Sequence, residues 1–191
     1  MLKSKWNSRY FFSFTALLML LVSATSYAAP PLWLKLRHTP SVGEGTKHPQ
    51  HLFYVITDAN CPYCHELWAE LQPYYNQGLR VRYVMVGILA DNSPGKAAAI
   101  LEARHPAAAL DRNERDWQRL PDDMGGGIPP LAKPKAKTLA LLKSDEQLMH
   151  DLGVQGTPAL IYIDSHGAMQ IIQSVPDPTA LAGIVHDAAA K

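Results

Sequence analysis

The only two cysteines of the chain, Cys61 and Cys64, are separated by two residues, and His65 follows them directly. A C-x-x-C pair can act as a dithiol redox centre, whereas the pattern C-x-x-C-H also matches the attachment site of a c-type haem. A zinc site would need two further ligands at matching spacing, but no second cysteine pair and no downstream H-x3–5-H pattern occurs. A structural disulfide across so short a loop would stabilise little, because the gain grows with loop length. The pair therefore favours redox chemistry, with haem attachment as a remote alternative.

The segment before the pair, 51–57 (HLFYVIT), is a nearly continuous apolar run rich in β-branched and aromatic residues. Such a run predicts a strand covered on both faces, as at the centre of a parallel sheet. Residues 58–60 suit a turn, and Pro62 suits the first position of a following helix, where its missing N–H costs nothing. Strand, C-x-x-C and helix in this order predict a thioredoxin-like redox motif.

The start of the predicted helix indicates which cysteine reacts. Free backbone N–H groups and the helix dipole stabilise an anion at this end of a helix, so we expect Cys61 to be the exposed nucleophile with a lowered pKa. Cys64 lies one turn further along the same helix face, and we expect it to be the buried partner that resolves a mixed disulfide. Pro62 and Tyr63 lie between the cysteines and are expected to tune their reduction potential.

A second candidate feature is Gly156-Thr157-Pro158, directly before the apolar run 159–164 (ALIYID). A proline that starts a strand is common and needs no function. The alternative is a cis peptide bond between Thr157 and Pro158, packed against the cysteine pair, which leaves neighbouring backbone free to pair with an extended substrate. The tripeptide is weak evidence alone, but together with the C-x-x-C motif it predicts a substrate-binding pair.

The rest of the pattern predicts an α/β domain. We expect further strands at 79–86, 156–164 and 168–175, and helices at 94–117 with a break at Pro106, at 135–152, and from Asp177 onward. Ser144 and Gln147 have capping-box spacing, which predicts that a new helix starts there. The stretch 119–134 contains three consecutive glycines without phosphate-loop spacing, so we expect a flexible connection. Without the helical block in the middle, the order is βαβ followed by ββα.

Residues 1–28 have the pattern of a cleaved signal peptide. Lys3, Lys5 and Arg9 precede an apolar stretch, and small residues lead up to Ala28. Loss of this leader removes three basic side chains and changes the formal net charge from +1 to −2. We therefore expect no nucleic-acid partner, because such a chain lacks a basic footprint.

The chain resembles the periplasmic DsbC/DsbG thiol:disulfide isomerases, and the DsbG type most. The stretches that carry the resemblance are YVITDANCPYCHELW, RYVMVGIL, SPGKAAAIL, LLKSDEQLMHDLGVQGTPALIY and VPDPTAL. It implies a thioredoxin-like catalytic domain over 51–191, with a helical insertion at about 92–150. It also implies that Cys61 attacks, that Cys64 resolves, and that Thr157–Pro158 is the threonine–cis-proline pair.

The activity that the resemblance implies is a periplasmic thiol–disulfide oxidoreductase acting on cysteine-containing exported proteins. No cofactor and no metal are implied, and the expected redox partner is a membrane thiol reductant of the DsbD type. The alternative is a chaperone-like module that holds unfolded exported proteins in the groove beside Thr157 and Pro158. Replacing Cys61 by serine should abolish the first activity and spare the second.

The segment 29–50 departs from the family pattern. Family members carry an N-terminal dimerisation domain and a linker helix, whereas this Pro- and Gly-rich segment predicts a lead-in with at most one edge strand near 39–42. We therefore expect a monomer, or at most a weak dimer, in which reductase or oxidase activity exceeds isomerase activity. The larger apolar side chains of the lead-in are expected to pack on the domain, with a small dimer patch as the alternative; they are Leu32, Trp33, Leu34 and Leu36.

Overall fold

The computed structural model describes residues 31–120 and 123–190, so the predicted leader at 1–28 lies outside them. In chain order the elements are α1 (Pro31–His38), β1 (Val42–Gly45), β2 (His51–Asp58), α2 (Pro62–Leu71), a 3-10 helix (Gln72–Gln77), β3 (Leu79–Val86), α3 (Ser93–Leu101), α4 (Pro106–Arg115), β4 (Gln118–Leu120), β5 (Asp123–Gly125), α5 (Ala136–Asp151), β6 (Ala159–Ile163), β7 (Met169–Ile172) and α6 (Pro178–Asp187). The main sheet has the strand order β1-β3-β2-β6-β7, and β4 and β5 form a separate two-stranded sheet.

The strand that leads to the cysteine pair, β2, is the centre of the sheet. It pairs in parallel with β3 along its whole length and antiparallel with β6, and seven of its eight residues are buried. β7 pairs antiparallel with β6, and β1 pairs antiparallel with β3 at the other edge. The order β2-α2-β3 followed by β6-β7-α6 confirms the predicted βαβ and ββα halves of a thioredoxin-like fold.

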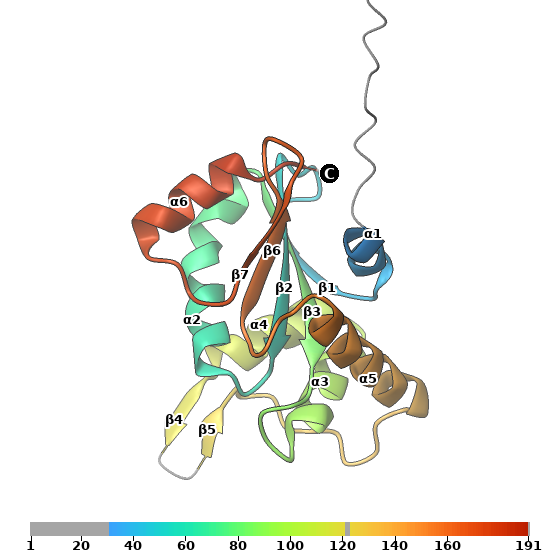
Figure 1. Ribbon diagram of the computed structural model, residues 1–191. Coiled ribbons are helices and arrows are strands. Elements are labelled where there is room, and N and C mark those ends of the chain that lie inside the picture. Colours follow the sequence, from blue (N-terminus) through green and yellow to red (C-terminus); the bar gives the residue numbers. More distant parts are fainter. Residues whose placement is uncertain (1–30, 121–122, 191) are drawn as a thin grey trace, which may run out of the picture.

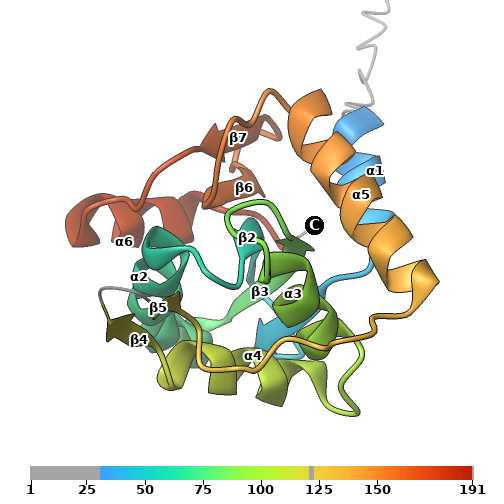
Figure 2. The ribbon, with the colours of Figure 1, turned by 90° about the horizontal axis from the view of Figure 1, so that it is seen from below.

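Helices cover both faces of this sheet (Figure 1). α2, α4 and α6 lie on one face, to which β2 contributes Phe53 and Val55; α1 and α5 lie on the other, to which it contributes Tyr54 and Ile56 (Figure 2). This alternation follows from the two-residue period of a strand. Each face therefore has its own hydrophobic core, and the central strand holds the two together.

The predicted helical insertion contains α3, α4 and α5, but two details of the prediction are wrong. Residues 118–120 and 123–125 pair as strands β4 and β5, where we expected a flexible connection. α5 runs without interruption past Ser144, so no new helix starts there. The reason is that Leu142 and Leu148 are buried on either side of this position, and their packing keeps the helix continuous in spite of the capping-box spacing.

The lead-in is more ordered than its composition predicted. Residues 31–38 form α1, whose Trp33 and Leu36 are 1% and 0% exposed and belong to the core beneath α5. Trp33 meets the ring of Tyr54 edge to face at 5.1 Å between centroids. Residues three apart share one helix face, so burial of this pair outweighs the coil-like composition. The predicted edge strand is β1, while Leu34 remains 43% exposed.

None of the helices in the described residues combines the length and the apolar character needed to cross a bilayer.

Candidate functional site

Cys61 occupies the N-cap of α2, directly before Pro62, the first helical residue. Its backbone is extended, with φ −83° and ψ 115°, and its Sγ accepts a hydrogen bond from the backbone N–H of Cys64 at 3.2 Å. Both cysteines are free thiols in this structure. The sulfur thus uses an N–H group that a helix leaves unsatisfied at its start, which is the environment that the sequence predicted.

The surroundings separate the pKa values of the two thiols. A hydrogen bond from the Cys64 side chain, helped by the backbone N–H groups of Cys64 and Tyr63, lowers the pKa of Cys61 from its ordinary 9.0 to about 7, against the effect of desolvation. Burial raises the pKa of Cys64 well above 9.0, and the hydrogen bond and charge of Cys61 raise it further. These shifts support Cys61 as the nucleophile and Cys64 as the resolving thiol.

The exposure of Cys61 differs from the prediction. We expected it to be exposed, but it is only 1% exposed in this reduced form, and Cys64 is 4% exposed. The cover comes from the loop before β6, because the Cys61 thiol donates a hydrogen bond of 3.3 Å to the carbonyl oxygen of Thr157. The two cysteines therefore differ in ionisation rather than in exposure.

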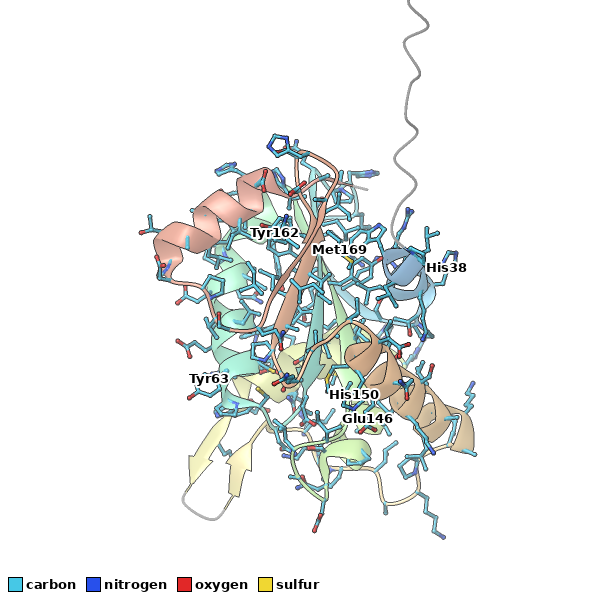
Figure 3. All side chains as sticks on the ribbon, viewed as in Figure 1. His38, Tyr63, Glu146, His150, Tyr162 and Met169 are labelled. Carbon is cyan, nitrogen blue, oxygen red and sulfur yellow. The ribbon has the colours of Figure 1, made fainter. Side chains whose placement is uncertain are left out.

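The peptide bond between Thr157 and Pro158 is cis and lies beside Cys61, as predicted. The two residues form one wall of a groove of about 390 Å³ beside the start of α2. Tyr63 also lines the groove and is 63% exposed, and Figure 3 shows it at the start of α2. The other lining residues are Glu66, Gln173, Ser174 and Val175. The groove thus brings together Tyr63, Thr157 and Pro158, which the sequence nominated separately, whereas Pro62 serves as the first residue of α2.

A buried polar network, absent from the sequence predictions, holds the turn before Cys61. The Asp58 carboxylate accepts hydrogen bonds from the backbone N–H groups of Ile88 and Leu89 at 2.7 and 3.1 Å and from the Ser93 hydroxyl at 2.8 Å. The Asn60 side chain donates to Ser93 Oγ at 2.9 Å. These hydrogen bonds connect the turn to the loop after β3 and to the start of α3, and so hold it in place.

Other parts of the insertion, α4 and the segment after β5, also form hydrogen bonds with this turn. Asn113 Nδ2 and the backbone N–H of Gly126 both donate to the carbonyl oxygen of Ala59, each at 3.1 Å. Lys96, which is 6% exposed, donates to the carbonyl oxygen of Gly126 at 2.7 Å. A Cβ at Gly126 would lie 2.0 Å from Asn113 Oδ1, so glycine is needed for close approach. No sequence signal marks these contacts, because they join segments far apart in the chain.

His65 and Glu114 form a polar pair next to the cysteines. The His65 ring stacks on Trp117 with 4.8 Å between centroids, and its Nδ1 lies 3.3 Å from Glu114 Oε2. The Glu114 side chain is 3% exposed. Burial, and in smaller part the charges of Glu44 and Cys61, raise its pKa from 4.5 to about 8, although a hydrogen bond from Asn113 acts in the opposite direction. Because aromatic rings and a carboxyl enclose the His65 ring, its geometry does not favour the haem-ligand interpretation.

The arrangement can perform thiol exchange. A sulfur with a pKa of about 7 is about half ionised at neutral pH, and a second thiol lies within reach to displace it. Within the described residues, no group of three or more histidine, cysteine, aspartate or glutamate side chains is placed to hold a metal ion.

Comparisons with known proteins agree with this geometry. A model of the thioredoxin-like domain matches residues 40–189. The thiol:disulfide interchange protein DsbG of Pseudomonas aeruginosa is 32% identical over 158 residues, which cover 82% of this chain and 59% of that protein. DsbG of Escherichia coli is 30% identical over 158 residues, which cover 81% of this chain and 60% of that protein. The chain thus spans about 60% of the length of these relatives.

Solved structures show the same fold. A periplasmic thioredoxin-like protein from Salmonella enterica serovar Typhimurium superposes with a TM-score of 0.66 at 25% identity, over 81% of this chain and 94% of that one. These similarities confirm the resemblance to DsbG that the motifs around Cys61 and Thr157 indicated. The chain belongs to the thioredoxin-like domain family.

Proposed function

We propose that the protein is a thiol–disulfide oxidoreductase that acts on cysteine-containing exported proteins. The observation that carries the proposal is the Cys61 sulfur, which lies at the N-cap of α2 with a pKa of about 7. It faces the cis Thr157–Pro158 bond and a second thiol. The similarity to two thiol:disulfide interchange proteins supports this activity.

In the proposed reaction the Cys61 thiolate attacks one sulfur of a substrate disulfide. A mixed disulfide forms, and the other substrate sulfur leaves as a thiolate. Cys64 then loses its proton and attacks the Cys61 sulfur, which releases the second substrate thiol and leaves a Cys61–Cys64 disulfide. The substrate gains the two electrons that the dithiol loses, and an external dithiol must reduce the protein again.

The groove beside the sulfur is the proposed substrate site. Thr157 and Pro158 line it together with the exposed ring of Tyr63, and its volume of about 390 Å³ suits a short extended segment rather than a folded domain. Amides of an incoming backbone would then compete for the Thr157 carbonyl, which accepts the Cys61 thiol hydrogen in the reduced form. Ionisation of Cys61 removes that hydrogen bond and leaves the carbonyl available.

We further propose that the protein works in the periplasm and that a membrane thiol reductant of the DsbD type restores its dithiol. Both points rest on the similarity to DsbG and on the signal-peptide pattern of 1–28. Trapping the redox state of the cysteine pair in cells with and without such a reductant tests the second point. The pair should be oxidised when the reductant is absent.

Two serine variants test the proposed activity. Cys61→Ser should abolish reduction of insulin disulfides. Cys64→Ser should stop turnover but accumulate a covalent complex with a cysteine-containing substrate, visible on a non-reducing gel and released by dithiothreitol. Insulin reduction by Cys61→Ser at the wild-type rate would overturn the proposal. A Cys61→Ser variant that still suppresses aggregation of an unfolded protein would show the chaperone-like activity in addition.

A further inference from the structure

A second pocket lies at the opposite end of β2 from the cysteine pair. Cys61 follows the C-terminal end of β2, whereas this pocket includes Leu52 and Tyr54, near the start of the strand. Both side chains belong to the core beneath α1 and α5, so the pocket lies on the sheet face away from α2. Its volume is about 350 Å³. The proposed thiol exchange makes no use of it.

Four cationic side chains line this pocket. Arg37 comes from α1, Lys47 from the segment between β1 and β2, and Arg80 and Arg82 from β3. We call these four residues, with Leu52 and Tyr54, the basic pocket. No acidic side chain is among its lining residues, and none of the four cations forms a salt bridge within residues 31–120 and 123–190.

The cations are close enough to act on one another. Desolvation and the charge of Arg82 lower the pKa of Arg80 below its ordinary value, and Glu44 and Tyr75 only partly offset this. The charges of Arg37 and Arg82 both act on the Tyr54 hydroxyl, although burial raises its pKa on balance. Several positive charges are therefore close together in the basic pocket, and no lining residue supplies a negative charge. Their mutual repulsion is unfavourable unless an anion binds.

The two β3 arginines are held in place without a ligand. Arg80 Nη1 donates to the carbonyl oxygen of Gly45 at 3.2 Å. A Cβ at Gly43 would lie 2.1 Å from Arg80 Nη2, so the guanidinium occupies space that only glycine leaves open at this position. The guanidinium of Arg82 lies over the Tyr54 ring, 5.9 Å from its centroid. Binding an anion would therefore require little ordering of these groups.

A solvated basic surface is the simplest alternative, since exposed Lys and Arg residues usually need no ligand. Three features argue against it: the residues surround a concavity, they come from α1, β3 and a loop, and Gly43 makes room for the Arg80 guanidinium. Guanidinium groups present planar pairs of donors that match phosphate oxygens. The pocket is also at the small end of the range of ligand sites, which suits a compact anion.

We propose that the basic pocket binds a phosphate-bearing anion. The shared chemistry is a phosphate group held by Arg37, Arg80 and Arg82, with Lys47 at the rim. Such a group can come from a free phosphate ester or from the headgroup of an anionic phospholipid, and binding assays with each source distinguish the two. The site lies away from Cys61, so it would anchor or regulate the domain without taking part in thiol exchange.

The first test is a titration of the full chain with inorganic pyrophosphate in metal-free buffer, followed by isothermal calorimetry. We expect saturable binding with Kd below about 1 mM. Arg82→Gln should weaken it about tenfold or more, because it removes a charge-assisted contact. Arg104→Gln is the matched control: it makes the same charge change at an exposed arginine outside the pocket, and its Kd should equal that of the wild type.

A second variant distinguishes binding at an ordered site from nonspecific attraction to positive charge. Gly43→Ala keeps every charge but displaces the Arg80 guanidinium, so it should also weaken pyrophosphate binding, while insulin reduction and thermal unfolding show that it still folds. Co-sedimentation with phosphatidylglycerol vesicles, and with phosphatidylcholine vesicles as control, tests the lipid source with the same variants. Absence of binding to both probes would overturn the proposal, as would equal losses in Arg82→Gln and Arg104→Gln or unchanged binding by Gly43→Ala.

Discussion

The hydrophobic cores on the two faces of the central sheet differ in how many polar side chains they enclose. Beneath α1 and α5 the core is mainly apolar, although it includes the buried carboxyl of Asp145, which accepts a hydrogen bond from Thr39 and whose pKa burial raises to about 6. Beneath α2, α4 and α6 the apolar core also encloses polar groups; they include Glu44, Tyr83, Asn113 and Glu114. The cysteine pair belongs to this second face, because α2 packs there.

The core beneath α1 and α5 therefore contributes mainly to stability, whereas the core beneath α2, α4 and α6 also positions polar groups beside the cysteine pair. Burial raises the pKa of Glu44, although its carboxylate accepts hydrogen bonds from Trp68 and Tyr75 at 2.9 and 3.0 Å. Such carboxyls reduce stability when they ionise, whereas apolar contacts are insensitive to pH. Substitutions on the two faces should therefore have different consequences for stability and for the cysteines.

The largest loss of stability is expected from Trp33→Ala on the apolar face. It removes a fully buried ring and its contact with Tyr54, which should lower the free energy of unfolding by about 3–5 kcal/mol. The pH dependence of Cys61 alkylation should not change, because the ring lies across the sheet. Urea denaturation and alkylation measure the two quantities. A loss below about 1 kcal/mol would show that α1 is not part of the folding unit.

On the polar face, Glu114→Gln tests the buried carboxyl. The pKa of Glu114 is about 8 in the folded protein and near 4.5 when unfolded, so the folded state binds more protons between these values. Wild-type stability should therefore fall as the pH rises from about 4.5 to about 8, by on the order of a few kcal/mol. Glutamine cannot ionise and should flatten this slope, which makes the variant the more stable protein at pH 8. The prediction fails if both proteins show the same slope in denaturation series across this range.

A smaller effect is expected from Asn113→Ala, which removes a buried donor to the Ala59 carbonyl oxygen. Gly126 still donates to that oxygen, so the loss should be about 1–3 kcal/mol. Gln147→Ala is the matched control, because it removes an exposed amide hydrogen bond to Asp151 and should cost less than about 0.5 kcal/mol. Equal losses in the two variants would mean that the insertion does not hold the turn before Cys61.

Local patterns were sufficient to predict where the cysteine pair lies in the fold. The apolar run of β2, Pro62 at the helix start and the spacing of Cys61 and Cys64 are all features of one short segment, and they placed the sulfur at the N-cap correctly. Thr157–Pro158 could be nominated because it directly precedes a buried strand, and the structure places it beside Cys61.

Contacts between distant segments could not be predicted in the same way. Asn113 and Gly126 donate hydrogen bonds to Ala59 only because the insertion folds back on the turn. No local sequence pattern indicates these contacts. The burial of Cys61 was missed for the same reason, since Thr157 covers it from the loop before the neighbouring strand β6. α1 was missed because Pro and Gly dominated the composition, although the spacing of Trp33 and Leu36 marked a single buried helix face.

The unequal acidity of the two thiols is the central claim, and pulsed alkylation of the reduced wild-type chain tests it most directly. Iodoacetamide is applied at a series of pH values, and mass-spectrometric fragmentation identifies the labelled cysteine. Cys61 should label first with a midpoint at about pH 7, and Cys64 only at a pH well above 9.0. Cys64→Ala should raise the Cys61 midpoint, because it removes the side-chain hydrogen bond that is the main cause of the lowered pKa of Cys61. A Cys61 midpoint near 9.0, or earlier labelling of Cys64, would contradict the account.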